Sequence, residues 1–265
     1  MILLVDVGNT ETVLGVWHDG TLSRRLRIES RSGPTPDQLG AELERLLREV
    51  GGRPGGFAGG MVASVVPPLT DAVLEAAWTY LGVQLVRIGS LDCLGIELRV
   101  DEPASVGEDR IANTLAVARL HRRDAVVVDL GTATTFDVIS AEGHFLGGVI
   151  APGLRTGAEE LFRKTALLPR VGLARPARVI GRTTAECIQA GVYLGAVAMI
   201  EGMLERIREE WGRGDVLVIA TGGLSPLLRG ASPAIHVIDE LLTLRGLVEA
   251  WRSGPGRERI EASSP

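Results

Sequence analysis

The sequence predicts an α/β protein that contains two similar units with a cleft between them. The first observation is a repeated pattern, in which an apolar strand ends in an aspartate, a polar turn follows, and a second apolar strand returns. The pattern occurs at residues 3–17 and 126–140, and a shift of 123 residues places Asp6 on Asp129 and Thr12 on Thr135. The second observation is that the elements expected after each copy follow the same order. The third is the composition, since 45% hydrophobic residues, 34 glycines and 4% aromatic residues are typical of a compact α/β fold.

The strands at the start of the first half follow from apolar runs. Such runs predict strands at residues 2–7 and 12–17, and the polar turn 8–11 joins them. A looser alternation of apolar and polar residues predicts a third strand at 21–30.

A helix is expected next, and the rest of the first half alternates strands with helices. Thr35 or Asp37 can cap the start of this helix, and Gly51-Gly52 can end it. Its apolar stripe consists of leucines at helical spacing, at positions 39, 43, 46 and 47. The following strand, helix and strand are expected at residues 59–67, 69–82 and 83–89.

The second half repeats this order after a connecting helix at residues 107–120. Paired strands are expected at 125–131 and 134–140, and the later elements at residues 144–153 (strand), 153–166 and 183–210 (helices), 215–223 (strand) and 239–253 (helix). We therefore expect an N-terminal half at residues 1–117, a C-terminal half at 118–251 and a mobile tail at 252–265, which has no apolar periodicity.

The bulk properties limit the classes of function. A net charge of −5 does not suit binding to a nucleic-acid backbone. Two cysteines, Cys93 and Cys187, are typical of reduced thiols in a cytosolic protein. Uninterrupted apolar runs are all well short of 18 residues, and Asp6 interrupts the first of them too early for a signal peptide. We expect a cytoplasmic protein that binds neither nucleic acid nor a membrane.

The polar turns of the repeated hairpins have the chemistry of a phosphate site. Backbone N–H groups and hydroxyls at such a turn can hold phosphate oxygens without a lysine, and Lys164 is the only lysine in the sequence. The aspartate that ends each first strand is an anion and suits a phosphate site only if a cation lies between them. Mg²⁺ held largely through water would satisfy this requirement at Asp6.

Six segments together resemble one family, the type III pantothenate kinases. They are "DVGNTETVLGVW", "GEDRIANTLAV", "VVVDLGTATTFDVI", "GGVIAPGL", "IGRTTAECIQAG" and "ATGGL". The resemblance covers roughly residues 1–250 in order. It implies the duplicated ribonuclease H-like fold of the acetate and sugar kinase, heat-shock chaperone and actin superfamily. It also implies a homodimer that uses ATP, Mg²⁺ and a monovalent cation, K⁺ or NH₄⁺, to convert pantothenate to 4′-phosphopantothenate, the first step of coenzyme A biosynthesis.

The resemblance assigns roles to individual residues. Asp109 would accept the proton of the pantothenate alcohol, and Asp129 would hold the monovalent cation. Asp6 would hold Mg²⁺ through water. ATP would be contacted by Asp6, Val7, Gly8, Asn9, Thr10, Glu11, Thr12, Val13 and Thr132, and pantothenate by Gly107, Glu108, Asp109, Arg110 and Thr184.

Each of these residues also has a plain structural interpretation. Asp109 can cap the helix at 107–120, whose dipole would lower the pKa of its carboxyl group. The resemblance implies that Arg110 holds Asp109 or the substrate, whereas its plain interpretation is a surface arginine on a helix. Asp129 can end a strand against backbone N–H groups. Thr183 or Thr184 can cap the next helix. The glycines of "ATGG" at 220–223 resemble those near adenosine in the superfamily, but they also suit a common turn.

Three positions depart from the pattern of the family. Val100 replaces a common tyrosine, Glu108 replaces a small residue, and Thr183 replaces a common asparagine. The departures affect the recognition of the substrate more than the transfer of the phosphoryl group.

Other classes fit less well. A Walker-type NTPase needs a glycine before its lysine, and the segment that precedes Lys164 has none. A dinucleotide-binding enzyme would need G-x-G-x-x-G after the first strand, and the four histidines are too scattered for a zinc hydrolase. The remaining alternative is a non-catalytic nucleotide-binding regulator of the same fold, which loss of Asp109 or Asp129 would favour; both are present.

Overall fold

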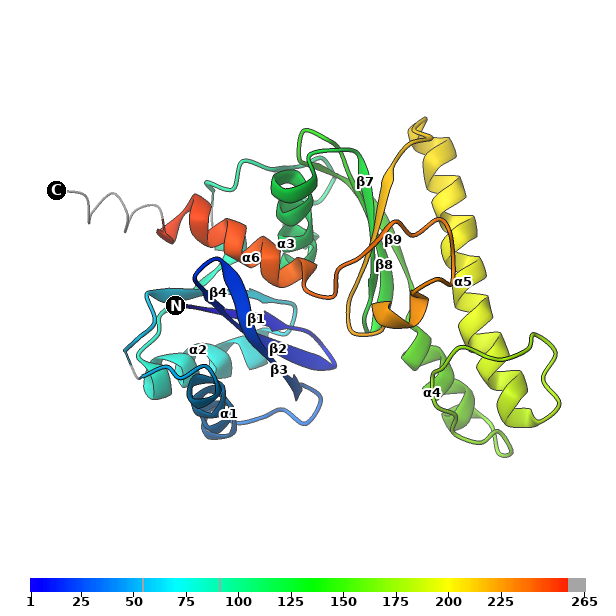
Figure 1. The fold of residues 1–265 in the computed structure, drawn as a ribbon, viewed down its shortest axis with the longest axis horizontal. Coiled ribbons are helices and arrows are strands. Elements are labelled where there is room, and N and C mark those ends of the chain that lie inside the picture. The colour runs from blue at the N-terminus through cyan, green and yellow to red at the C-terminus, as the bar shows by residue number, and fades with distance from the viewer. Residues whose placement is uncertain (54, 91, 257–265) are drawn as a thin grey trace. The chain divides into compact units, whose positions relative to one another are not determined.

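The computed structural model describes residues 1–53, 55–90 and 92–256, which form two compact units (Figure 1). The first unit contains Met1–Arg122, Gly143–Phe145 and the chain from Leu242 onward. The second contains Arg123–Glu142 and Leu146–Leu241. The expected halves, divided after residue 117, stay a prediction about the duplication. Most of the predicted tail, residues 257–265, lies outside the described residues.

The first unit is a five-stranded sheet in the order β3-β2-β1-β4-β5, with helices on both faces. β1 is antiparallel to β2 and parallel to β4. The strands are β1 (Ile2–Val7), β2 (Glu11–His18), β3 (Thr21–Glu29), β4 (Gly59–Ser64) and β5 (Leu85–Arg87), and the helices are α1 (Pro36–Glu49), α2 (Pro67–Leu81), α3 (Glu108–Ala116) and α6 (Leu242–Ser253).

The core of this unit lies between the sheet and the helices α1 and α2. Alternate residues of β1 point into it, and the leucines of the α1 stripe pack against them. Thr35 caps α1, because its Oγ1 accepts the Gln38 N–H at 3.3 Å while the Gln38 side chain accepts the Thr35 N–H at 2.9 Å. The sequence allowed Thr35 or Asp37 as the cap, and the structure selects Thr35.

The opposite face of this sheet is covered by α3 and α6. The two helices approach closely at Gly246, where a Cβ would lie 1.9 Å from the Ala112 carbonyl oxygen. The Thr243 hydroxyl also donates to Asn113 Oδ1 at 3.0 Å in this buried contact. The predicted helix 107–120 has the expected extent, but its last turn, Val117–His121, is a π-helix that ends at Arg122 with φ +53°.

The second unit repeats the topology of the first. β9, β8, β7, β10 and β11 follow one another in the same arrangement as β3, β2, β1, β4 and β5. β7 is antiparallel to β8 and parallel to β10, as β1 is to β2 and β4. The elements are β7 (Ala125–Leu130), β8 (Ala133–Ile139), β9 (His144–Pro152), α4 (Leu154–Lys164), α5 (Thr184–Trp211), β10 (Leu217–Thr221) and β11 (Val237–Ile238). The shared order confirms the duplication predicted from the two hairpins.

Two details of the prediction need correction. β11 and β6 (Glu97–Leu98) are two-residue strands, too short to leave a periodic signal. The two hairpins also differ in length, since Val7 pairs with Thr12 in the first hairpin but Leu130 pairs with Thr134 in the second. Thr134, not Thr135, is therefore the structural counterpart of Thr12, and both threonines are buried.

Within the described part of the chain, α5 alone is long and apolar enough to cross a membrane by length and composition. A core helix of a globular protein has the same properties. Tyr193, Ile200 and Leu204 of α5 are buried against the second sheet, and the Tyr193 hydroxyl donates to the Leu227 carbonyl at 2.7 Å. These contacts make α5 a packing element of the second unit.

Candidate active site

The tip of the first hairpin consists of Gly8, Asn9 and Thr10. The Gly8 N–H donates to the Glu11 carbonyl at 3.1 Å, and a Cβ on Gly8 would lie 2.9 Å from that oxygen, so the turn favours glycine. Asn9 is exposed. The tip thus presents backbone and small polar groups, which are the groups expected at a phosphate site.

The other predicted ATP-contacting residues of this hairpin have side chains engaged elsewhere. Thr12 is fully buried and shares a 2.8 Å hydrogen bond with Ser30, and Val7 lies in the core. Glu11 forms an ion pair with Arg27, with 3.0 Å between Oε2 and Nη1. Val13 is partly buried within β2.

Asp6 lies one residue before the end of β1, on the face of the sheet that carries α3 and α6. Leu3, Val5 and Val7 point toward α1 and α2, so the alternation of the strand places Asp6 on the opposite face. Asp6 stands between Val13 of β2 and Ala63 of β4 and is partly exposed.

Asp109 approaches the same end of the sheet from α3. Gly107 precedes the first turn, and its Cβ position is 3.2 Å from Cγ1 of Val65. Val65 follows β4 and donates its N–H to the Val7 carbonyl at 3.1 Å. The start of α3 therefore lies at the carboxyl ends of β1 and β4, and Asp6, the hairpin tip and Asp109 all belong to this edge of the first unit.

The carboxyl group of Asp109 is held close to its own helix turn. Its Oδ1 accepts the Arg110 N–H at 2.8 Å, and Gly107 leaves it room, since a Cβ there would lie 2.5 Å from the same oxygen. Burial raises the pKa of the Asp109 carboxyl group above its ordinary value, and it outweighs the Arg110 N–H and the Arg110 charge, which lower the pKa. The prediction of a lowered pKa from the helix dipole was therefore wrong, because loss of hydration is the larger effect.

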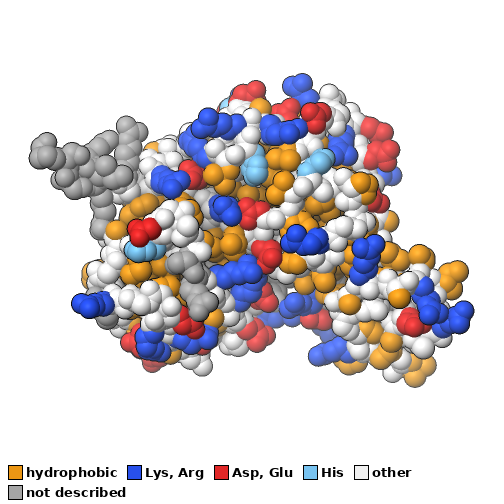
Figure 2. All heavy atoms as spheres, viewed as in Figure 1, with side chains coloured by type: hydrophobic (Ala, Val, Ile, Leu, Met, Phe, Trp, Pro, Cys, Tyr) orange, Lys and Arg blue, Asp and Glu red, His pale blue; other side chains and the backbone are white. Residues whose placement is uncertain are grey.

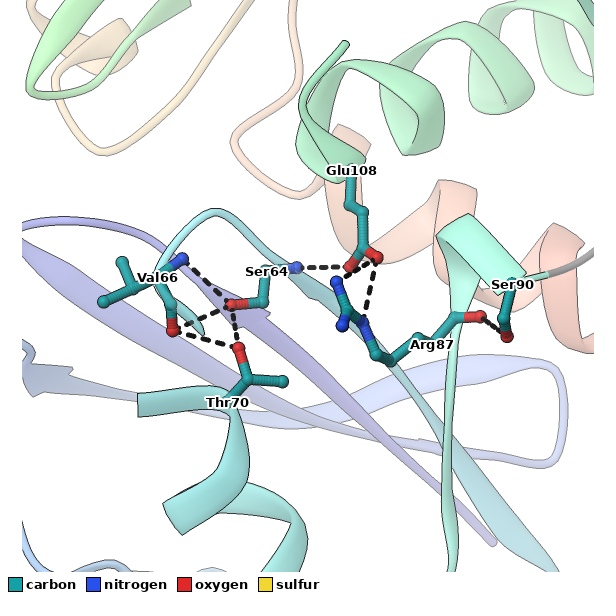
Figure 3. Close-up of polar contacts among 6 residues, drawn as sticks. All are labelled: Ser64, Val66, Thr70, Arg87, Ser90 and Glu108. Atoms are coloured by element: carbon teal, nitrogen blue, oxygen red, sulfur yellow. Dashed lines mark hydrogen bonds and ion pairs between the residues drawn. The ribbon is translucent and has the colours of Figure 1, made fainter. Parts of the chain in front are cut away.

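The side chains on either side of Asp109 also contact other residues. The guanidinium of Arg110 lies over the Phe145 ring, 4.9 Å from the centroid. The carboxylate of Glu108 turns into the unit, where it contacts Ser64 and Arg87 (Figure 3). Sequence reasoning missed Ser64 and Arg87, because neither belongs to a recognisable motif.

In the second unit, Asp129 lies one residue before the end of β7, between Thr135 of β8 and Thr221 of β10. A Cβ on Gly222, whose φ is +85°, would lie 2.3 Å from Asp129 Oδ1. The glycine of the "ATGG" segment thus lets the chain pass close to the Asp129 carboxylate. Thr221 is 1% exposed, and its hydroxyl has no hydrogen-bond partner among the described residues. A buried hydroxyl beside a carboxylate has the chemistry of a cation site.

The exposed residue Thr132 belongs to the tip of the second hairpin. The tip rests on Gly153, where a Cβ would lie 2.3 Å from the Thr132 carbonyl oxygen. The Thr156 hydroxyl donates to the same oxygen at 2.7 Å. These contacts fix the backbone of the tip and leave the Thr132 side chain at the surface.

Thr184 is the first residue of α5 and is exposed. Thr183 caps the helix, since its Oγ1 accepts the Glu186 N–H at 3.2 Å, so Thr184 is not needed as the cap. Glu186 also accepts two backbone N–H groups, from Arg182 and Thr183, and these bonds lower the pKa of its carboxyl group. Thr184 lines an apolar cavity of about 640 Å³ with residues of α4, α5, the end of β9 and the segment between the two helices, among them Leu161, Leu168, Cys187 and Met199.

The sequence matches one protein family along most of its length. The pattern that defines the family described as type III pantothenate kinase matches residues 2–206. The type III pantothenate kinase of Paramagnetospirillum magneticum is 40% identical over 253 residues, which cover 95% of this chain and 97% of the relative. That of Myxococcus xanthus is 42% identical over 247 residues, which cover 93% and 96%.

Solved structures share the fold at low sequence identity. A Campylobacter jejuni protein whose name describes it as a conserved Baf family transcriptional activator superposes with a TM-score of 0.58 at 18% identity over 96% of this chain and 100% of that chain. A Sinorhizobium meliloti protein whose name describes it as a 2-dehydro-3-deoxygalactonokinase gives 0.55 at 14% identity over 95% and 98%. The activator of 2-hydroxyisocaproyl-CoA dehydratase from Clostridium difficile gives 0.55 at 11% over 100% and 98%. The likeness confirms the actin-like fold class.

The raised pKa of the Asp109 carboxyl group predicts how the stability of the folded protein depends on pH. The folded protein binds the proton of Asp109 at a higher pH than the unfolded chain does, so the carboxylate destabilises the fold once the pH rises through the folded pKa. We expect Asp109→Asn to raise Tm at pH 7, and the difference to vanish near and below pH 3.8, the ordinary value. Thermal unfolding from pH 3.5 to 8 measures this, with Asp71→Asn on the exposed face of α2 as the control. An Asp109→Asn protein with unchanged Tm at pH 7 would contradict the desolvation of Asp109.

Proposed function

The chain belongs to the type III pantothenate kinase family, and we propose that Asp109 accepts the proton of the pantothenate alcohol during phosphoryl transfer. The enzyme transfers the γ-phosphoryl group of ATP to pantothenate in coenzyme A biosynthesis. The observation that carries the assignment of Asp109 is its position. A partly buried carboxylate stands at the edge of the sheet where the first hairpin tip presents its backbone groups.

In phosphoryl transfer the protein mainly positions the reactants and stabilises charge, and it takes little part in the covalent chemistry. The oxygen of the pantothenate alcohol forms a bond to the γ-phosphorus, the bond from that phosphorus to the oxygen that bridges it to the β-phosphate breaks, and ADP leaves with the electron pair. The proton of the alcohol passes to Asp109 late in a loose transition state, so the carboxylate mainly aligns the alcohol. A raised pKa makes Asp109 a stronger base than an exposed aspartate and suits this step at neutral pH.

The tip of each hairpin presents groups that suit the phosphate oxygens of a nucleotide without a lysine. The N–H groups and small polar side chains of Gly8, Asn9 and Thr10 are suited to phosphate oxygens, and Thr132 of the second tip supplies an exposed hydroxyl. These groups carry no full positive charge, so cations must neutralise the phosphates. Because the side chains of Thr12 and Glu11 are engaged within the first unit, they would act through their backbone or by shaping the tip.

Mg²⁺ fits beside Asp6. Mg²⁺ in kinases is commonly bound by one or two carboxylates together with phosphates and water, and Asp6 offers a partly exposed carboxylate next to the tip. Bound there, Mg²⁺ would neutralise charge on the transferred group. Asp6 would orient it through its water ligands.

A monovalent cation fits beside Asp129. The Asp129 carboxylate supplies negative charge, and the buried Thr221 hydroxyl supplies a second oxygen on the neighbouring strand in register. K⁺ or NH₄⁺ at this position would add positive charge beside the second hairpin tip. The cation would also satisfy the Thr221 oxygen, which has no hydrogen-bond partner within the described residues.

We propose that the functional form is a cytoplasmic homodimer. Apolar side chains gather on the surface over α4 and the start of α5 (Figure 2), where Leu167 is 91% and Ile180 83% exposed. A second copy would cover this surface and the apolar cavity that Thr184 lines. Thr184 would then face pantothenate. A non-catalytic regulator is not favoured, because Asp109 and Asp129 are both present.

The assignment of Asp109 is tested by turnover. Asp109→Asn keeps the size of the side chain but removes the base, so we expect kcat to fall roughly 10²-fold or more, the usual cost of a lost general base. The measurement couples ADP release to NADH oxidation with ATP and pantothenate, and mass spectrometry identifies the phosphorylated product. Asp71→Asn should keep wild-type turnover. An Asp109→Asn enzyme with most of its activity would reduce Asp109 to a structural residue.

The cation site is tested by removing its two proposed ligands, the Asp129 carboxylate and the Thr221 hydroxyl, one at a time. Asp129→Ala should abolish activity, and wild-type activity should require K⁺ or NH₄⁺ and fail with Na⁺ or Li⁺. Thr221→Val removes a buried hydroxyl without changing the shape, so it should keep the fold while raising the K⁺ concentration for half-maximal rate about tenfold, as expected for loss of one of few ligands. Full activity in buffer without K⁺ and NH₄⁺ would refute the site. An unchanged K⁺ dependence in Thr221→Val would remove Thr221 from it.

The role of Asp6 is tested by titrating Mg²⁺. Asp6→Asn should lower kcat and raise the Mg²⁺ concentration needed for half-maximal rate, because the amide carries no charge to orient the hydrated ion. The KM for pantothenate should stay within about twofold, since a group that acts on the nucleotide metal does not bind this substrate. Superimposable Mg²⁺ curves for the two proteins would show that Asp6 only ends a strand.

A further inference from the structure

The Glu108 carboxylate accepts a hydrogen bond from β4 at a position beyond the end of the neighbouring strand β5. β4 and β5 pair only from Gly60 to Val62 of β4, because β5 ends at Arg87. Ser64 lies two residues further along β4, and its N–H donates to Glu108 Oε2 at 2.8 Å. Figure 3 shows the Glu108 side chain reaching from the start of α3 to both Ser64 and Arg87. The carboxylate thus continues the hydrogen bonding of β4 beyond the end of β5.

The other carboxylate oxygen binds Arg87. Oε1 accepts Nε of Arg87 at 3.0 Å and Nη2 at 2.8 Å, a bidentate arrangement that fixes the plane of the carboxylate. The Glu108 side chain is only 11% exposed, whereas that of Arg87 is 50% exposed. A Cβ on Gly89 would lie 2.6 Å from Oε1, so the backbone also packs closely against the group. Glu108 is therefore turned inward and is not directed toward a substrate.

The acceptor site for Glu108 is rigid. Ser64 pairs with Val7 across the β1–β4 register. The Ser64 hydroxyl accepts the Thr70 hydroxyl at 2.5 Å and the Val66 N–H at 3.1 Å, which connects it to the first turn of α2. Ser64 therefore connects the Glu108 carboxylate to the end of β1, which contains Asp6 and leads into the hairpin tip.

Glu108 and Asp109 are consecutive, and they divide two tasks. The first turn of α3 begins at Gly107, which has no side chain to cap it, so Glu108 supplies the side-chain attachment of this turn to the sheet. We propose that Glu108, held by Arg87 and Ser64, is a positioning residue that fixes the Asp109 carboxylate relative to the first hairpin tip. This inference rests on the proposed role of Asp109 as proton acceptor.

The expected effect follows from the sensitivity of phosphoryl transfer to alignment. A displacement of about 1 Å in a reacting group can cost on the order of 10²-fold in rate. Helix termini fray readily, and an unanchored first turn of α3 would let Asp109 sample orientations away from the alcohol. Loss of the attachment should therefore lower kcat while the nucleotide site keeps its affinity.

The experiment compares Glu108→Gln with a matched change elsewhere in the first unit. Glu108→Gln keeps the shape but removes the charge that Arg87 binds, and we expect kcat to fall about tenfold with the KM for ATP within about twofold. Glu42→Gln removes the charge that Arg45 binds on the exposed face of α1 and should leave both constants unchanged. Arg87→Ala removes the two hydrogen bonds from Arg87 to Glu108 but keeps the one from Ser64, and it should also lower kcat. It replaces Glu108→Gln as the decisive variant if the latter does not fold.

A double variant separates positioning from general destabilisation. In an Asp109→Asn background no carboxylate is left to position, so adding Glu108→Gln should cost less than about twofold in kcat. A merely structural role would give the same fractional loss in both backgrounds. That result, or full kcat in Glu108→Gln, would overturn the inference. A wild-type protein that forms no phosphorylated pantothenate would instead refute the proposed function, so the two failures are distinguishable.

Discussion

β4 extends past its short neighbour β5, and at that point the Ser64 N–H makes the hydrogen bond that joins the sheet to the start of α3. A backbone N–H at the end of a buried strand needs an acceptor, because leaving it unpaired costs about 1–3 kcal/mol. The acceptor here is the Glu108 carboxylate, 2.8 Å away on the first turn of α3. The sheet and the helix are thus joined where the strand order leaves a gap. Asp109 follows Glu108 directly, so the requirement for a hydrogen bond at Ser64 also determines where Asp109 stands.

The environment of Asp109 makes its ionised carboxyl group unfavourable for folding. The Arg110 N–H and the Arg110 charge both favour the ionised carboxyl group, yet burial outweighs them and raises the pKa. A buried carboxylate whose lost hydration is only partly replaced by other interactions is a stronger base than an exposed one. It also contributes less to the stability of the fold. The inward-facing Glu108 differs, because a bidentate arginine and a backbone N–H compensate its charge. In our proposal, these two adjacent acidic residues serve different purposes, since Glu108 anchors the helix and Asp109 takes part in the chemistry.

The sequence allowed the duplicated fold to be predicted, because each hairpin combines an apolar strand, an aspartate and a polar turn. The motifs also singled out Asp6, Asp109 and Asp129 as candidate site residues, and their roles stay predictions. Comparing the halves at a fixed shift could not reveal that the second tip is one residue shorter, and so it paired Thr12 with Thr135 instead of Thr134. The burial of the Glu108 side chain could not be predicted either. An acidic residue in the first turn of a helix is normally expected to be exposed, where it interacts favourably with the helix dipole. Only the early end of β5, a tertiary feature, makes its burial favourable.

Amide hydrogen exchange measures directly the hydrogen bond that joins Ser64 to Glu108. In the wild-type protein the Ser64 amide should be protected like that of Val65, which donates to the Val7 carbonyl at 3.1 Å. In Glu108→Ala, exchange at Ser64 should accelerate by about tenfold or more while Val65 stays unchanged, because local opening affects only the amide that lost its acceptor. Rapid exchange of Ser64 in the wild-type protein, or equal protection of Ser64 in Glu108→Ala, would contradict the account.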